Sequence, residues 1–327
     1  MAEPLSGRRR FVSAALGIAG LSALPVESKA ADPDSFAFAL IGDNPYGERD
    51  EGDFSRVLSS FDPDCEFVIH VGDIKSSSES CADDLLARRR GLLDASPLPL
   101  VYTPGDNEWS DCGRPAAGGF EPLERLARVR QMFFAQARSR GSRPLPLQRQ
   151  SDVYPRSQRA ENVRWRRGGL LFVTANRPGG VDWKHLSEAQ SAAMQALEAE
   201  NTQWLRDSFA LAARERARAV VVCTHADPFF ERDTRKPIKD DTHRPFRRQL
   251  RQLSESFGGQ VLLLHGDTHR FRVDQPLRDA NGATLVRFTR LESFGWPFGA
   301  SWVHVRVAAD QDPAFIVTAR HLMGTAP

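Results

Sequence analysis

Short apolar runs alternate with helical patterns over the first half of the chain. Three of the runs predict buried strands that each end in a Gly-Asp turn. They are SFAFALIGD (35–43), EFVIHVGD (66–73) and LPLVYTPGD (98–106). Between the first two runs, apolar residues repeat at helical spacing, at Phe54, Val57, Leu58 and Phe61. A second helical pattern, at 83–96, precedes the third run. Strand and helix in alternation predict parallel β-α units.

The second half continues the pattern and then turns to strands alone. Strands that end in polar residues are predicted at 169–180, 219–230 and 260–270, with helices at 187–214 and from Phe246 to Phe257. Three further strands, at 283–290, 301–307 and 314–320, follow with little helix. Residues 141–167 are rich in Pro and Arg and aperiodic, which indicates a long surface excursion, with a role as a lid left open.

Five of the predicted strands end on Asp or His. These polar residues are Asp43, Asp73, Asp106, His225 and the group His265, Asp267 and His269. Singly, an Asp after Gly is most often a turn former, and a His at a strand end is most often structural. Together they would meet at the carboxyl edge of a parallel sheet, where ligands bind in α/β proteins. Carboxylates and imidazoles without thiols favour hard or borderline metal ions.

In order and spacing these motifs resemble the calcineurin-like metallophosphoesterases. The matching segments, over about 36–270, are GDNPY, VGDIK, PGDNEW, CTHADP and HGDTHR. The resemblance implies an α/β fold, a four-layer αββα sandwich of two mixed β-sheets with the metal site at the carboxyl edge. It also implies two metal ions that share a hydroxide placed for attack on phosphorus.

The resemblance implies a role for each matching residue. Asp43 and His269 would hold one metal, and Asp73 would bridge both. Asp106, His225 and Asp267 would complete the second site. Glu108, in PGDNEW, would orient its neighbours.

Three positions depart from the family pattern. Pro45 stands where the family has a ligand His, so Asn44 or Tyr46 would have to fill that place, or an extra water would. Asp106 and Asp267 are carboxylates in place of neutral ligands, which favours Mn, Mg, Ca or ferric iron over Zn, although the metal identity stays open.

The third departure is Asn107, which stands where the family has its general-acid His. Asn107 can donate a hydrogen bond to a leaving oxygen but cannot deliver a proton. His265 or His185 are the candidates for that proton. A small phosphorylated substrate would be contacted by Asn44, Lys75, Asn176 and Arg270, and Trp109 would either wall the pocket or pack beneath its loop.

The first thirty residues predict an export signal, and residues 31–327 a single metallophosphoesterase-like domain. Residues 1–30 join a basic start to an uncharged apolar stretch from Phe11 to Val26. Arg8 and Arg9 resemble a twin-arginine signal, which implies a periplasmic or secreted protein. The alternative is an ordinary export signal with an arginine-rich start.

Charge and cysteines bear on partners and compartment. The first thirty residues hold four of the 44 basic and two of the 42 acidic residues, so the remainder is balanced. Net charge therefore gives no argument for nucleic acid or membrane as a partner.

Cys81 and Cys112 lie in polar loops and are predicted to pair, whereas Cys65 and Cys223 are expected as buried thiols.

The sequence thus predicts an exported metal-dependent hydrolase of phosphate mono- or diesters. The alternative is a protein of the same fold that binds a metal or a phosphorylated ligand without catalysis, which Pro45, Asn107 and Asp267 favour. The retained Asp43, Asp73, His225 and His269 favour the enzyme. The oligomeric state stays open.

Overall fold

Five strands form the first of two β-sheets. The computed structural model describes residues 35–179, 186–230, 241–309 and 315–322. The strand order is β12-β11-β1-β2-β3. Strands β1 (Phe36–Ile41), β2 (Cys65–His70) and β3 (Leu100–Tyr102) run parallel. Strand β11 (Ser301–Val307) is antiparallel to β1, and β12 (Phe315–His321) is antiparallel to β11. The sheet is therefore mixed.

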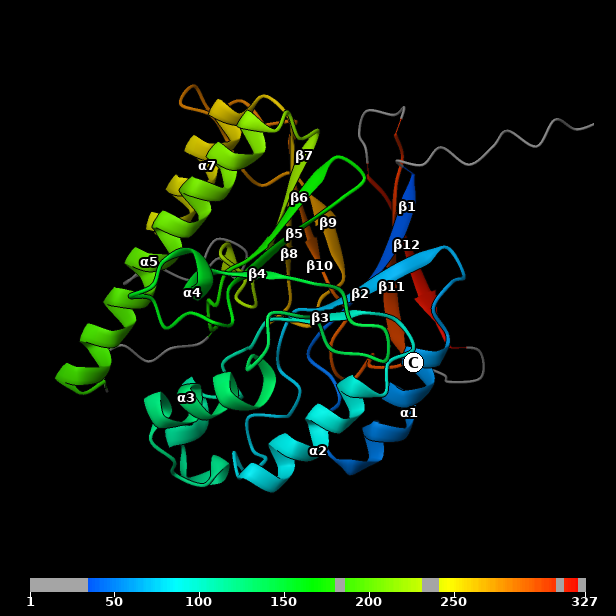
Figure 1. Cartoon of the computed structure of the whole chain (residues 1–327), viewed down its shortest axis with the longest axis vertical. Coiled ribbons are helices and arrows are strands. Elements are labelled where there is room, and N and C mark those ends of the chain that lie inside the picture. The colour runs from blue at the N-terminus through cyan, green and yellow to red at the C-terminus, as the bar shows by residue number, and fades with distance from the viewer. Residues whose placement is uncertain (1–34, 180–185, 231–240, 310–314, 323–327) are drawn as a thin grey trace, which may run out of the picture. The chain divides into compact units, whose positions relative to one another are not determined.

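The second sheet has seven strands in the order β4-β5-β6-β7-β8-β10-β9. Its parallel strands are β6 (Leu170–Thr174), β7 (Ala219–Cys223), β8 (Gln260–His265) and β10 (Phe288–Glu292). Strand β5 (Val163–Arg167) is antiparallel to β6, β4 (Gln148–Arg149) is antiparallel to β5, and β9 (Arg272–Asp274) is antiparallel to β10. Figure 1 shows the two sets of strands within the fold.

The two sheets pack face to face because alternate residues of each strand point to opposite sides. In β1, Phe36, Phe38 and Leu40 join the core between the sheets. Ala37, Ala39 and Ile41 lie on the other face, toward the helices. Phe38 meets Phe172 of β6 edge to face, with ring centroids 5.6 Å apart. An aromatic core thus fixes one sheet on the other.

Helices cover the outer face of each sheet. Helices α1 (Glu48–Ser59), α2 (Asp83–Asp94) and α3 (Pro122–Phe133) share a core with the first sheet. Helices α5 (Glu188–Arg214) and α7 (Arg244–Phe257) share one with the second sheet. The short helix α4 (Gln150–Val153) lies between β4 and β5. The four-layer αββα sandwich of two mixed sheets is confirmed.

Sequence signals set the ends of the two long helices. The Ser187 hydroxyl accepts a hydrogen bond from the backbone N–H of Gln190, and Gln190 returns one to Ser187. This capping box starts α5 at the predicted place. Gly258 has φ 78° and ends α7, since a left-handed residue is most easily a glycine.

The prediction for residues 141–167 was wrong in part, because this segment contains β4, α4 and β5. The strand predicted at 283–290 begins only at Phe288. The expected set of parallel strand ends belongs to two packed sheets, not to one sheet. Residues 1–30, the predicted export signal, lie outside the described residues. No helix in the described ranges is long and apolar enough to cross a membrane.

Candidate metal centre

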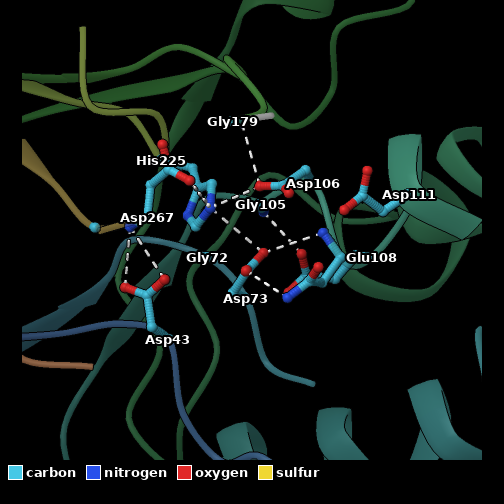
Figure 2. Close-up of polar contacts among 12 residues, drawn as sticks. Asp43, Gly72, Asp73, Gly105, Asp106, Glu108, Asp111, Gly179, His225 and Asp267 are labelled. Atoms are coloured by element: carbon cyan, nitrogen blue, oxygen red, sulfur yellow. Dashed lines mark hydrogen bonds and ion pairs between the residues drawn. The ribbon is translucent and has the colours of Figure 1, made fainter. Parts of the chain in front are cut away.

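The six predicted metal ligands lie in turns that follow parallel strands of both sheets. Asp43, Asp73 and Asp106 follow β1, β2 and β3 of the first sheet. His225 follows β7 of the second sheet, and Asp267 and His269 follow β8. Because the carboxyl ends of the parallel strands of both sheets meet, residues far apart in the chain come together here (Figure 2).

The ring of His225 lies at the centre of the group. Its Nε2 is 2.9 Å from Asp106 Oδ1, 3.4 Å from Asp73 Oδ1 and 3.9 Å from Asp267 Oδ1. His269 Nε2 lies 3.4 Å from Asp43 Oδ1. Potential ligand atoms lie within 4.8 Å of one another in two sets, Asp43 with Asp73 and His225, and Asp106 with His225 and Asp267. Both sets have the compactness that metal coordination requires.

Four of the six residues have a strained backbone. The φ angles are 51° at Asp43, 58° at Asp73, 77° at Asp267 and 60° at His269. In the described ranges, the one other non-glycine residue with positive φ is Arg216. Such conformations cost roughly 1–3 kcal/mol each and persist where the surroundings impose them, often at functional sites.

The hydrogen bonds of His225 test whether the residues fit a metal. Its Nδ1 lies 2.8 Å from the carbonyl of Val71, which can only accept, so Nδ1 carries the proton. Nε2 is buried and lies 2.9 Å from Asp106 Oδ1 and 3.4 Å from Asp73 Oδ1. It can carry a proton and pair with these carboxylates, but as a lone pair it is unfavourable there unless a cation is bound, and carboxylates with an imidazole suit divalent ions. The residues present therefore fit a metal site.

The protonation of the cluster reflects this crowding. Burial raises the pKa of Asp73 well above its usual range and that of Asp267 to about 7. Burial also opposes ionisation of Asp106, but the hydrogen bond and charge of His225 hold its pKa at about 2. The pKa of His225 is raised, because the carboxylates of Asp73 and Asp106 outweigh its burial. Without cations the cluster retains protons, which metal binding would release.

Asn107 holds Asp73 in place. Its backbone N–H donates to Asp73 Oδ1 at 3.1 Å, and its side-chain Nδ2 donates to Asp73 Oδ2 at 2.5 Å and to the Lys75 carbonyl at 3.0 Å. An amide NH₂ has two donors, and both are engaged. Asn107 therefore acts through Asp73, whereas the sequence suggested a hydrogen bond to the leaving oxygen.

Glu108 joins the loop after β2 to the loop after β3. Its carboxylate accepts hydrogen bonds from the backbone of Ile74 at 2.5 Å and of Gly105 at 2.8 Å. Gly105 allows this close approach, because a Cβ there would lie 2.0 Å from Asp73 Oδ1. The sequence expectation that Glu108 orients its neighbours agrees with these contacts.

Tyr46 occupies the region that Pro45 leaves without a ligand. Its hydroxyl donates to Asp73 Oδ2 at 3.1 Å and lies 3.3 Å from His269 Nε2. Burial, with the negative charge of Asp73, raises the pKa of the phenol well above its ordinary value. The Asn44 side chain instead donates to the Gly299 carbonyl at 2.8 Å. Of the two replacements that the sequence left open, Tyr46 contacts the cluster.

Asp111 is a residue of this site that sequence reasoning missed. Burial and the charge of Asp106 raise its pKa to about 7, and Arg114 pairs with it at 2.6 Å. Gly179, at the end of the segment after β6, donates its N–H to Asp106 Oδ1 at 3.2 Å. The acidic loop sequence after PGDNEW was the one available signal for Asp111.

His265 lies in a different buried cluster, with Asp227 and Glu292. Its Nδ1 lies 2.8 Å from the Gly266 carbonyl, and its Nε2 lies 3.9 Å from Asp227 Oδ1. The structure therefore places the His265 ring apart from the six residues. His185, the other candidate proton donor, lies outside the described residues.

Asn44 directly follows Asp43, but the other three predicted substrate contacts are not gathered at the six residues. Lys75 is buried, with its Nζ on the Ser76 carbonyl, and Asn176 is buried and donates to Glu161 at 3.2 Å. Arg270 is exposed. Within the described ranges, no hydrogen bond or ion pair joins Lys75, Asn176 or Arg270 to the six residues. Trp109 is buried and packs with Leu126, Met194 and Leu197, as in the second of the two roles expected for it.

The predicted disulfide between Cys81 and Cys112 is present, with Cα atoms 5.7 Å apart. It links the segment after β2 to the segment after β3, which carries Asp106. Cys65 and Cys223 are free and buried, and burial raises the pKa of Cys65 to about 12.

Comparisons with known proteins give structural likenesses alone. No protein-family model and no curated protein matches the chain. A purple acid phosphatase from yellow lupin (Lupinus luteus) seeds is 13% identical, with a TM-score of 0.49 over 87% of this chain and 53% of its own. A putative 5'-nucleotidase from Staphylococcus aureus is also 13% identical, with a TM-score of 0.49 over 89% of this chain and 55% of its own.

A third similar structure is GAP50, the anchor in the inner membrane complex of Plasmodium. It is 9% identical, with a TM-score of 0.47 over 88% of this chain and 89% of its own. The chain spans about half the length of the first two structures.

Proposed function

We propose that this protein is an exported, metal-dependent hydrolase of phosphate mono- or diesters. One observation carries the proposal: the buried Nε2 of His225 lies 2.9 to 3.9 Å from three carboxylates that follow strands of both sheets. The αββα fold and the order of the motifs support the same function.

Each of the six residues has a place in this proposal. Asp43 and His269 would hold one metal ion, Asp73 would contact both, and Asp106, His225 and Asp267 would hold the second. When bound, two such ions polarise a phosphate and activate water for attack on phosphorus. Asn107 keeps the Asp73 carboxylate oriented through two hydrogen bonds. The Tyr46 hydroxyl, which donates to Asp73 and lies beside His269, would help Asn107 to orient the Asp73 carboxylate.

A second candidate is a metal-binding protein that does not catalyse. The full engagement of both Asn107 side-chain donors favours it, because Asn107 then has no hydrogen bond to give to the leaving oxygen. This candidate predicts the same metal content as the enzyme but no turnover.

The deciding experiment measures bound metal and turnover together. The purified protein is loaded with Mn²⁺ or Fe, its metal content is determined, and nitrophenyl phosphate and bis(nitrophenyl) phosphate are assayed. Loss of a residue that contacts both ions, in Asp73→Asn, is expected to lower turnover by at least about 100-fold, since changes behind metal ligands alone cost 10–100-fold. Asp94→Asn, in an ion pair with Arg140 away from the site, serves as the control.

Three outcomes separate the candidates. If the wild type binds two metal ions and turns over substrate, and Asp73→Asn abolishes that turnover, the hydrolase is supported. Metal without turnover under any loading supports the non-catalytic protein. No bound metal excludes both.

Export rests on the sequence alone, through Arg8 and Arg9. Replacement of both by Lys should hold the precursor in the cytoplasm if the twin-arginine route is used. Cell fractionation with antibody detection measures this. Unchanged export of the variant would leave an ordinary export signal as the explanation.

A further inference from the structure

An aromatic pocket lies beside the candidate metal centre. It has a volume of about 540 Å³ and is lined by the start of α1, the segment 297–301 and side chains from nearby loops. Its side walls include three aromatic rings and two carboxylates, those of Phe271, Phe294, Phe298, Asp50 and Asp53. This volume is that of a small-molecule site.

The same backbone segment supports the metal ligands and lines the pocket. The Trp296 N–H donates to the Asp43 carbonyl at 3.1 Å, and His269 Nδ1 lies 2.8 Å from the Trp296 carbonyl. Asn44, directly after Asp43, lines the pocket and donates to the Gly299 carbonyl at 2.8 Å. The pocket therefore adjoins the candidate metal centre through Asn44 and the segment after Trp296.

The aromatic side chains of this region are unusually exposed. Phe271 stacks on Phe294 with ring centroids 4.7 Å apart and planes 12° apart, yet remains 37% exposed. Phe298 is 43% exposed, and its neighbour Trp296 is 51% exposed. Clustered exposed aromatic groups mark a surface that a ligand covers.

The pocket is also acidic. Among the described residues that line it, none is Lys or Arg, Asp50 and Asp53 are both present, and His321 is the remaining titratable side chain. Asp50 accepts a hydrogen bond from the Tyr46 backbone at 3.3 Å, and Asp53 pairs with the exposed Arg56. An anionic group such as phosphate would be repelled here, and a cation would be attracted. Aromatic rings together with carboxylates suit a quaternary ammonium group, through cation–π and Coulomb attraction.

We propose that this pocket binds the cationic alcohol portion of a phosphate ester, with the quaternary ammonium group in the pocket and the phosphate at the metal centre. The proposal rests on the proposed function and names its substrate class. In the reaction, a water oxygen forms a new bond to phosphorus while the bond from phosphorus to the alcohol oxygen breaks. The alcohol leaves with a proton from that water.

A matched pair of esters tests the proposal. Choline phosphate and 3,3-dimethylbutyl phosphate have the same shape, but the first carries a positive charge and the second does not. The wild-type protein should hydrolyse choline phosphate with a kcat/KM at least tenfold higher. Asp50→Asn and Phe298→Leu should each lower this ratio toward one. Asp84→Asn, an exposed carboxylate on α2, should leave the ratio unchanged.

Binding without turnover provides the second measurement. Tetramethylammonium and neopentyl alcohol are titrated calorimetrically into the metal-loaded wild type and Asp50→Asn. The wild type should bind tetramethylammonium at least tenfold more tightly than neopentyl alcohol, and Asp50→Asn should reduce this preference.

The outcomes distinguish the two proposals. Equal kcat/KM for the two esters, with measurable turnover, overturns the pocket proposal and leaves the hydrolase standing. No turnover of these esters or of the nitrophenyl esters overturns the hydrolase. In that case equal binding of tetramethylammonium and neopentyl alcohol overturns the pocket proposal as well, and a tenfold preference for the cation supports the pocket as a cation site.

Discussion

Contacts of single buried side chains define the candidate site at the residue scale. His225 Nε2 lies among three carboxylates, and Asp73 receives hydrogen bonds from Asn107 and Tyr46. These contacts hold a carboxylate in one orientation before any ion binds. Because this carboxylate is held in one orientation, the addition of a single carbon atom to a residue beside Asp73 should disturb its geometry.

Gly105→Ala should disrupt the metal centre with little change elsewhere. The added Cβ would lie 2.0 Å from Asp73 Oδ1 and 2.7 Å from the Asp73 backbone N, so the carboxylate would have to move. We expect Mn²⁺ affinity, measured by calorimetry, to fall by at least about tenfold.

Gly91→Ala is the matched control for this change. Gly91 lies within α2, where a Cβ would meet nothing within 4 Å. Alanine there should stabilise the protein by roughly 0.5–1 kcal/mol, through helix propensity, and leave Mn²⁺ affinity unchanged. Equal Mn²⁺ affinities in the two variants would show that Asp73 is not confined as the structure indicates.

The buried carboxyl group of Glu292 should make the free energy of unfolding depend on pH. Burial raises the pKa of its carboxyl from 4.5 to about 7. The folded protein therefore keeps this proton over a range in which the unfolded chain has lost it, and the free energy of unfolding falls as pH rises from 4.5 to 7. The contribution lost is about 3 kcal/mol, at 1.36 kcal/mol for each pKa unit.

Glu292→Gln should remove this loss, because Gln keeps an oxygen for the Thr268 hydroxyl and the Arg270 N–H and does not ionise. In urea unfolding at pH 4.5 to 7.5, the stability of the variant relative to wild type should rise with pH. A difference that stays constant over this range would contradict the raised pKa.

Much of the site could be predicted from the order of the motifs along the chain. The direction in which each side chain points could not be predicted. Asp43, Asp73, Asp106 and Asp267 come together because each directly follows a parallel strand, which the sequence shows. His265 is two residues from Asp267, yet its ring lies beside Asp227 in another cluster. Local sequence gives no signal of that direction, and the same is true of the Tyr46 hydroxyl between Asp73 and His269.

At the scale of elements, those with a clear hydrophobic periodicity could be predicted from the sequence, and those without one could not. Helix α5 was predicted to within a residue, since Ser187 marks its start and its apolar spacing is continuous. Strand β5 was missed because three of its five residues are arginines, which leaves only Val163 and Trp165 as an apolar signal. Arg164 lies over the ring of Trp204 at 4.5 Å, so a charged side chain covers the core at a position where an apolar one is expected.

The disulfide is expected to stabilise the two loops that carry Asp73 and Asp106. Cys81 and Cys112 are separated by 31 residues, and closing a loop of this length stabilises the folded state by about 3–4 kcal/mol in the chain-entropy treatment. The double variant Cys81→Ser and Cys112→Ser should lose about that much free energy of unfolding and bind Mn²⁺ more weakly. Urea unfolding and calorimetry measure the two effects.

Cys65→Ser provides the comparison, because Cys65 is a buried free thiol away from these loops. It is expected to leave Mn²⁺ affinity unchanged. If the double variant retains wild-type Mn²⁺ affinity, the disulfide serves overall stability and does not hold the loops of the metal centre.

At the scale of the whole fold, the candidate site joins the two sheets. Asp43, Asp73 and Asp106 follow strands of the first sheet, and His225, Asp267 and His269 follow strands of the second. The aromatic core between the sheets fixes their packing, and bound ions would connect their edges. Metal binding should therefore raise the stability of the fold as a unit, by about 2.7 kcal/mol when free metal is 100 times the dissociation constant.

The effect of Asp267→Asn on the free energy of unfolding should have opposite signs in the metal-free and the metal-loaded protein. Burial raises the pKa of Asp267 to about 7, so its ionised form costs stability at pH 8 when no cation is present. In a chelator at pH 8 the variant should be more stable than wild type by roughly 1–4 kcal/mol, since the amide carries no charge. In saturating Mn²⁺ the wild type should gain more than the variant, which lacks one carboxylate ligand. Urea unfolding under both conditions gives the comparison, with Asp94→Asn as a control that should show no reversal. A variant less stable than wild type in the chelator would mean that the buried carboxylates do not repel one another, and the main physical argument for a metal centre between the two sheets would fail.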